Sequence, residues 1–491
     1  MNKIKEVFTD KSLYLFGIMT LLFFGVFASM QYAPDTYFVF AQSTRAVVEQ
    51  FFSCGRFVTG IAAIVFKGAL DFSPQYIYML SYIFAIICTI ISLYRLYKLI
   101  NKDIENKIIC IILSMLIVIN IFSFELFVYI EKGIMMFSVL MSILAVEQVD
   151  KLLKSKKWKQ ALIAALYMLV ATCSYQGTIG IFVAISLIYI LKYSKNIKEF
   201  ILNNVKVALI YGIPSIINFI LVRFTNYNSR VAGNIIISET IAKVIQGVKN
   251  LFINTYNLFP KYAFILIIFA IIVLAIYKLL NDKEEKNKTK ILKVLGIAYI
   301  LCGTVFATIA PQVLQNTDSI WFVARSSYPA ASVIGIMLIY IFSNFKITNT
   351  EKNIIIVTAC IYILVQFICF NIFGVNGYIV NYEDKKIATK IINMIEDYEK
   401  QTGNKITKIA IYQDKYLTYT YPNLKTSGDI NTRAFCTEWA ANSIINYYSG
   451  RQLESTEANA QLQDYFQEND WKEFEEKQIL FEKDIIHLCL Y

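Results

Sequence analysis

The sequence predicts an all-α polytopic membrane bundle of about 11 transmembrane helices, followed by a small C-terminal α/β domain on the extracytoplasmic side. The chain has 491 residues, of which 57% are hydrophobic and only 17% are charged, and its mean hydropathy is +0.51. Soluble domains carry roughly 25% charged residues. Long apolar runs recur up to Phe373, and the composition then becomes polar. These observations predict a membrane domain, 1–373, and a tail domain, 374–491.

The expected spans follow the apolar runs, each of which is typical of a membrane-crossing helix. The first run is too long for the apolar part of a signal peptide and has no convincing cleavage site, so it is expected to stay as a span. The predicted spans lie at roughly 12–30, 75–94, 108–124, 134–147, 160–174, 178–192, 205–222, 262–279, 291–310, 329–343 and 354–373.

Lysine residues predict the orientation. They concentrate in every second loop, beginning with Lys3, Lys5 and Lys11, so these loops are expected to be cytoplasmic, with the N-terminus inside and the tail outside. The same rule explains the net charge of +11 better than nucleic-acid binding does, and no nucleic-acid partner is expected. An apolar stretch at 57–70 would invert all later loops if it crossed, so it is expected to lie along the interface or enter part-way. It belongs to a long first external loop, 31–74.

The tail shows mixed periodicity. A helical stretch is followed by a strand at KITKIAIY, a helix at CTEWAANSIINYYSG that ends at Gly450, and two short strands in QILFEKDIIHLCLY. This length is sufficient for one small α/β domain. A disulfide between Cys436 and Cys489 is open at this point. His487 is the single histidine, which argues against histidine-based catalysis or a histidine-rich metal site.

The first candidate group is acidic and basic. Asp35 follows the first span, with Arg45 and Arg56 in the same loop. A charge at the rim of a bundle costs on the order of 2.5–3.5 kcal/mol, so each needs a partner or a task. The acid could act as a general base, and an arginine could bind a phosphate bidentately. An interfacial salt bridge that fixes the loop is the alternative.

Two predicted turns carry further polar groups. Glu125 and Glu131, with Lys132 beside them, could orient sugar hydroxyls or bind a cation, or could be solvated loop acids. Tyr175 and Gln176 could form hydrogen bonds to a sugar, although a tight turn uses such residues in any case.

Arginines at the expected external rim run against the positive-inside bias. These are Arg223, Arg230 and Arg325, the last followed by Ser326. An anionic headgroup such as a phosphate-linked lipid explains them, and contact with ordinary lipid phosphates is the alternative. The sequence has no Walker loop, dinucleotide fingerprint, HExxH or GxSxG motif, which favours a lipid-phosphate donor over a nucleotide sugar.

The pattern resembles the GtrII-type glucosyltransferases, polytopic bacterial enzymes of the GT-C class that use polyprenyl-phosphate glucose. The residues that carry the resemblance are Asp35, Gly55-Arg56, the turn from Phe124-Glu125 to Tyr129-Ile130-Glu131, and Tyr175-Gln176. The tail, with Lys408 to Tyr412, Arg433-Ala434 and His487 to Tyr491, resembles that of Gram-positive members. One departure is that Asp35 is followed by Thr36, where the family often has a second acid.

The expectation is therefore a glycosyltransferase that moves a hexose, glucose by resemblance, from a polyprenyl-phosphate donor to an extracytoplasmic cell-envelope glycan. Its location would be the bacterial plasma membrane, and the bilayer, a small flippase and a donor-synthesising glycosyltransferase are the implied partners. No cofactor or metal is expected, with a divalent cation left open. The expected roles are catalysis by Asp35, donor-phosphate binding by Arg56, Arg223, Arg230 and Arg325, and sugar or acceptor positioning by Glu125, Glu131, Tyr175 and Gln176.

Three other functions are the alternatives. A glycan polymerase would share the same external chemistry and stays open. A lipid-linked oligosaccharide flippase or transporter would place charges along a central path, whereas most predicted spans have none at their centres. A purely structural envelope-assembly protein would leave the external arginines unexplained.

Overall fold

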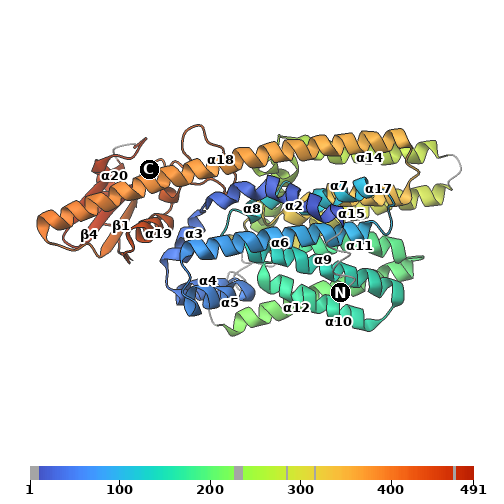
Figure 1. Ribbon diagram of the computed structural model, residues 1–491, viewed down its shortest axis with the longest axis horizontal. Coiled ribbons are helices and arrows are strands. Elements are labelled where there is room, and N and C mark those ends of the chain that lie inside the picture. Colours follow the sequence, from blue (N-terminus) through green and yellow to red (C-terminus); the bar gives the residue numbers. More distant parts are fainter. Residues whose placement is uncertain (1–9, 226–235, 283–285, 314–316, 468–470) are drawn as a thin grey trace. The chain divides into compact units, whose positions relative to one another are not determined.

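The computed structural model describes residues 10–225, 236–282, 286–313, 317–467 and 471–491 (Figure 1). It is mostly helical, and its contacts divide it into two compact units. The bundle unit comprises Met1–Gly25, Val48–Phe127 and Glu131–Asn371. The tail unit comprises Val26–Val47, Val128–Ile130 and Ile372–Tyr491. Two short stretches that lie early in the sequence, including the one that carries Asp35, therefore belong to the tail unit.

The helices that precede residue 225 correspond to the first seven predicted spans and the loops between them. They are α2 (Lys11–Phe24), η1 (Gly25–Ser29), α3 (Pro34–Ala41), α4 (Thr44–Ser53), α5 (Phe57–Ala63), η2 (Ile64–Ala69), α6 (Pro74–Ile100), α7 (Lys107–Val118), α8 (Ser123–Leu126), α9 (Lys132–Ser155), α10 (Trp158–Ser174), α11 (Gly180–Tyr193) and α12 (Ile197–Phe224).

The helices that follow, up to the start of the sheet, include one that no span prediction covered, α13. They are α13 (Ile237–Lys249), η3 (Asn250–Asn254), η4 (Thr255–Asn257), α14 (Ala263–Asn281), α15 (Asn287–Val313), η5 (Thr317–Ser319), α16 (Tyr328–Ala331), α17 (Val333–Asn344) and α18 (Asn349–Thr402).

Seven of the described helices are long and apolar enough to cross a membrane, namely α2 with η1, α6, α9, α12, α14, α15 and α18. The protein is therefore a membrane protein. The predicted count of about 11 spans is not confirmed, because four of the runs form helices of only 10–17 residues, α7, α10, α11 and α16 with α17. The stretch predicted to lie at the interface forms α5 and a π-helix, η2.

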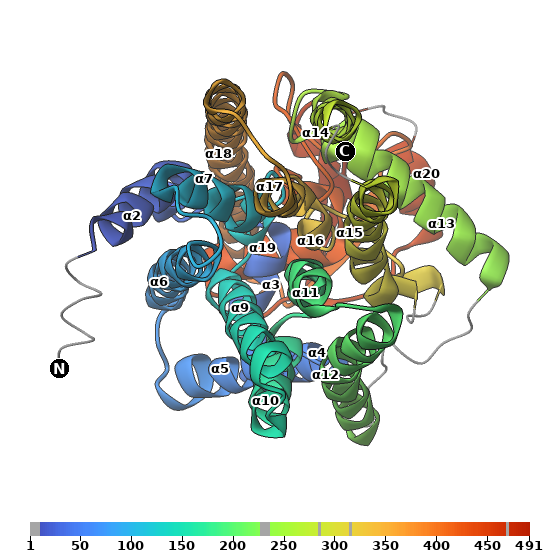
Figure 2. The ribbon, with the colours of Figure 1, turned by 90° about the vertical axis from the view of Figure 1, so that its right-hand side faces the viewer.

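The buried fraction of each apolar helix indicates whether it lies inside the bundle or at its outer surface. In α9, 78% of the most apolar window is buried, against 28% in α12 and α14, whose remaining apolar side chains face outward. Figure 2 shows α9 and α11 inside a ring of other helices. The run at 134–147 is longer than predicted, because α9 continues to Ser155. Its last turns contain acids that form ion pairs, Glu147 with Arg95 of α6 and Asp150 with Lys102 in the turn that follows α6.

The helix α18 runs without a break from Asn349 to Thr402 and thus through Phe373. At 1.5 Å per residue its 54 residues extend about 81 Å, and a bilayer core is only about 30 Å thick. Its polar second half therefore cannot lie in hydrocarbon, and it contributes to the tail unit. The helix ends at Gly403, whose φ of +76° is the left-handed conformation that glycine adopts without strain.

The tail unit contains a four-stranded sheet in the order β2-β1-β4-β3. In it, β1 (Lys408–Gln413) is parallel to β2 (Glu454–Ser455) and β4 (Ile485–Leu490), and β3 (Ile479–Glu482) is antiparallel to β4. The predicted helix is α19 (Glu438–Ser449), which ends at Gly450, and a short helix, α20 (Ala460–Gln467), follows. These elements confirm the strands and the helix that the sequence predicted.

Two further features of the tail unit concern predictions. Cys436 and Cys489 are both buried free thiols, so the disulfide that the sequence left open is absent from this structure. The early helix α3 packs on α19 through aromatic side chains. In particular, the rings of Tyr37 and Phe40 lie 5.7 and 5.8 Å from that of Tyr447. This packing places Asp35, in the first turn of α3, in the tail unit.

Candidate active site

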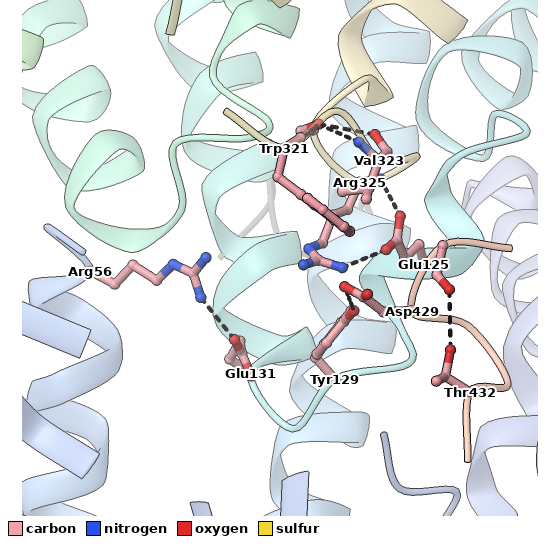
Figure 3. Close-up of polar contacts among 11 residues, drawn as sticks. Arg56, Glu125, Tyr129, Glu131, Trp321, Val323, Arg325, Asp429 and Thr432 are labelled. Carbon is pink, nitrogen blue, oxygen red and sulfur yellow. Dashed lines mark hydrogen bonds and ion pairs between the residues drawn. The ribbon is translucent and has the colours of Figure 1, made fainter. Parts of the chain in front are cut away.

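Among the described arginine–glutamate ion pairs of the bundle unit, two lie where helices begin and end (Figure 3). The Arg56 Nη1 atom donates to Glu131 Oε1 at 3.1 Å. Arg325 donates twice to Glu125, from its backbone N–H to Oε2 at 2.6 Å and from Nη1 to Oε1 at 2.5 Å. The glutamate side chains are only 6% and 1% exposed, while the Arg56 and Arg325 side chains keep 23% and 15%. The sequence singled out all four residues but not their pairing.

Arg56 is positioned by a turn that requires glycine before it. Gly55 has a φ of +72°, and a Cβ there would lie 2.5 Å from Asn218 Oδ1 and 2.9 Å from Gln176 Nε2. The two amides instead hold the turn through its carbonyls. Gln176 Nε2 donates to the oxygens of Cys54 and Gly55 at 3.2 and 3.0 Å, and Asn218 Nδ2 donates to that of Gly55 at 2.8 Å. The amide of Gln176, expected to face a sugar, therefore contacts the backbone beside Arg56.

Arg325 lies in a loop that closes on itself just before α16. The Ser326 hydroxyl accepts from the Val323 N–H at 3.1 Å and donates to the Val323 carbonyl at 3.0 Å. The next residue, Ser327, shares a 2.9 Å hydrogen bond with the Tyr256 hydroxyl. Ser326 and Ser327 are buried, which leaves Arg325 as the charged side chain of this loop segment.

Tyr175 contacts the first ion pair and is influenced electrostatically by the second. It is the residue at which α10 ends, and the Arg56 guanidinium lies over its ring at 4.9 Å from the centroid. Burial raises the pKa of the Tyr175 phenol above its usual value, although the charges of Arg325 and Arg56 act to lower it. Tyr175 is therefore a neutral hydrogen-bonding group that both arginines influence electrostatically.

One donor in this cluster has no partner. The Arg56 Nε atom is buried and makes no hydrogen bond to any residue that the structure describes. An unsatisfied buried donor costs about 1–3 kcal/mol, and more when it belongs to a charged group. The geometry thus leaves a guanidinium N–H without an acceptor among the residues that the structure describes.

Asp35 is half-buried in the tail unit. Arg223 is exposed in the last turn of α12, with its guanidinium 5.3 Å from the centroid of the Phe219 ring. Arg230 falls outside the described residues. Tyr129, from the turn between the two glutamates, donates to Asp429 Oδ2 at 3.1 Å within the tail unit.

Sequence reasoning missed two residues that build this site. Asn218 is a buried amide in the apolar run of α12. Burying an amide is costly unless it is hydrogen-bonded, so its presence in this run could have indicated a structural role. Tyr256 follows Thr255 in a turn where both residues have positive φ, +51° and +47°. Such backbone is rare for residues other than glycine, and nothing in the sequence indicates it.

The fold and the cluster define a class, a helical membrane protein in which paired arginines and acids gather at helix ends beside a buried tyrosine. A comparison with protein families then identifies it more closely. The family model of glucosyl transferase GtrII matches residues 23–328, which is more than half of the chain. The protein therefore belongs to the GtrII glucosyltransferase family and is a glycosyltransferase. All the predicted site residues, from Asp35 to Arg325, lie in the matched part. No curated protein matches the sequence.

Proposed function

We propose that this protein transfers a glucosyl residue from a polyprenyl-phosphate donor to an extracytoplasmic cell-envelope glycan, as a GT-C-class enzyme. The observation that carries the proposal is the pair of guanidinium groups at Arg56 and Arg325, held by buried glutamates, with the Arg56 Nε–H unsatisfied. A phosphate oxygen is the acceptor that best suits an arginine, because the charges and the geometry of the donors both match.

In the proposed reaction, the acceptor hydroxyl loses its proton to Asp35 and its oxygen attacks the anomeric carbon. The bond between that carbon and the phosphate oxygen breaks, and the polyprenyl phosphate leaves with the electron pair. Arg56 and Arg325 stabilise the negative charge that develops on this leaving group. Because their glutamate partners already fix the guanidinium groups, little reorganisation is needed when the charge develops.

The other side chains have supporting roles in this proposal. Glu125 and Glu131 orient the arginines and offer their remaining acceptor capacity to sugar hydroxyls, and Tyr175 donates to the sugar from the ring that Arg56 covers. We propose that Gln176 acts mainly on the backbone beside Arg56, since its amide already donates to two carbonyl oxygens there. Arg223 would assist at the rim, where lipid phosphates are also available.

The proposed setting is the plasma membrane of a bacterium, crossed several times, with the N-terminus in the cytoplasm and the tail unit outside. The alternation of lysine-rich loops supports this orientation. A flippase that delivers the lipid-linked sugar and a glycosyltransferase that makes it would be its functional partners. No cofactor is proposed.

The test is transfer by the purified protein in nanodiscs, with radiolabelled glucosyl polyprenyl phosphate as the donor and UDP-glucose as the comparison. Label should pass to an envelope-glycan acceptor from the lipid donor alone. In cells, deletion of the gene should remove a side-branch hexose and leave the polymer length unchanged. A shortened polymer would indicate a polymerase instead, and lipid-linked precursor retained inside the cell would indicate a flippase.

Asp35→Asn is expected to abolish transfer, because an amide cannot accept the hydroxyl proton, while the protein still inserts and accumulates. The assay is the same nanodisc transfer, normalised to folded protein. Near-normal transfer by this variant would remove Asp35 from the mechanism.

A further inference from the structure

The helix α13 lies between two helices that are long enough to cross the membrane, α12 and α14. Its side chains divide by type around the helix. Ile237, Ile241 and Ile245, spaced four residues apart, form one stripe and are 72%, 53% and 63% exposed. Glu239 and Gln246 are exposed on the opposite side. An apolar stripe that faces outward and a polar face behind it are typical of a helix that lies in a membrane interface.

A third face of α13 packs against the loop that carries Arg325. The Thr240 hydroxyl lies 3.1 Å from that of Thr317, and Lys243 Nζ donates to the Thr317 carbonyl at 2.7 Å. Gly247 allows α13 to approach the Phe322 ring closely, since a Cβ at this position would lie 2.6 Å from the ring. The helix is thus fixed to both ends of the segment from Thr317 to Phe322.

The surroundings of α13 mark a membrane boundary. The residues just before α14 are Lys261 and Tyr262, with the Lys261 ammonium 4.9 Å from the centroid of the half-exposed Tyr262 ring. Trp321, in the loop on which α13 packs, is 59% exposed. Tyrosine, tryptophan and lysine gather at the interfaces of membrane proteins. In Figure 2, α13 is seen lengthwise, whereas α15 and α18 are seen nearly end-on. The helix therefore runs across the direction of these two helices, both long enough to cross a membrane.

We propose that α13 lies in the membrane–water interface, with the stripe of Ile237, Ile241 and Ile245 in contact with phospholipid chains. The bilayer is the occupant that fits best, because helices on both sides of α13 enter it and because the neighbouring Lys261, Tyr262 and Trp321 suit the headgroup region. The helix thereby fixes the depth of the Arg325 loop in the membrane. The location of α13 does not depend on the proposed reaction. The role of α13 in placing Arg325 for a donor phosphate does rest on that reaction.

The test uses nitroxide labels in proteoliposomes. Ile241→Cys and Glu239→Cys are made in a background in which the four cysteines with exposed or partly exposed side chains, Cys54, Cys302, Cys360 and Cys369, are replaced by alanine. The two labelled positions are two residues apart on opposite sides of the helix, so they form a matched pair. Power saturation then measures collisions with oxygen, which partitions into lipid, and with a water-soluble nickel chelate.

We expect oxygen to exceed the nickel chelate at Ile241→Cys and the reverse at Glu239→Cys. Preferential access of the nickel chelate at Ile241→Cys would show that the stripe faces water and would overturn the proposal. Low access of both reagents there would also overturn it, since the stripe would then be covered by another protein or a second copy. None of these outcomes depends on sugar transfer, so the proposed reaction and the location of α13 can fail separately.

Discussion

The most direct test of the arginine–glutamate arrangement is Glu125→Gln. The two carboxylate oxygens of Glu125 accept from the backbone N–H and from Nη1 of Arg325, at 2.6 and 2.5 Å, and the glutamate side chain is 1% exposed. Glutamine has one acceptor oxygen, so its NH₂ group must face one of these two donors. One hydrogen bond that involves a charged group is lost, and Arg325 is held by one hydrogen bond to residue 125 instead of two.

The expected loss follows from these contacts. A hydrogen bond to a charged group contributes about 1.5–3 kcal/mol. Because about 1.4 kcal/mol corresponds to a factor of ten, kcat/KM for transfer from the lipid donor is expected to fall roughly 10- to 150-fold. If Arg325 acts on the leaving phosphate, the decrease is mainly in kcat. The assay is steady-state transfer in nanodiscs, normalised to folded protein measured by size-exclusion chromatography.

A matched control is available in the same bundle. Glu147 is also a mostly buried glutamate paired with an arginine, and Arg95 Nε donates to it at 2.6 Å. It lies about 24 Å along α9 from Glu131, by the rise of the helix. Glu147→Gln should therefore reduce stability but leave transfer per folded molecule close to wild type. Equal losses of transfer in the two variants, or a change of less than about twofold in Glu125→Gln, would refute the reasoning.

Gly55→Ala is expected to remove most transfer, because its Cβ would meet Asn218 Oδ1 at 2.5 Å and its φ of +72° disfavours alanine. Gly212→Ala, where no atom lies within 4 Å of the added Cβ, is the control, and equal activity of the two would contradict the role of the turn. Burial lowers the pKa of His487, so the neutral imidazole is favoured in the folded tail unit. Its contribution to stability is complete above about pH 6.5 and is lost as the pH falls through the folded pKa. As the pH falls below about 6.5, hydrogen exchange of β4 in the full chain should show a larger loss of protection in the wild type than in His487→Gln. Parallel pH curves for the two proteins would contradict this role of His487.

Apolar runs predicted the helices well because hydropathy is a local property. Where a helix ended in acids, however, the prediction stopped too early. The run at 134–147 continues to Ser155 because Glu147 pairs with Arg95 of α6 and Asp150 pairs with Lys102, just after α6. These pairings are tertiary contacts, and a window of hydropathy contains no information about them.

The site was predicted as a set of residue types but not as an arrangement. Charge at the ends of apolar runs was enough to single out Glu125 and Arg325, but their pairing joins positions 200 residues apart and depends on how the helices pack. Gln176 was assigned to a sugar, whereas packing turns its amide to the backbone beside Arg56. The span prediction places α13 in a loop, although the spacing of Ile237 and Ile241 is typical of a helix.

Stability alone does not account for the two arginine–glutamate pairs. Burying an ion pair removes two charges from water, and apolar side chains of similar volume are often as stable or more so. The Arg325–Glu125 pair is more buried than the Arg95–Glu147 pair, whose arginine side chain is 43% exposed. Arg56 has the added cost of a buried Nε–H without an acceptor among the described residues. An arrangement with these costs becomes favourable when an anion supplies the missing acceptor. The energetics therefore support, independently of the family match, the proposal that these arginines bind an anionic group such as a phosphate.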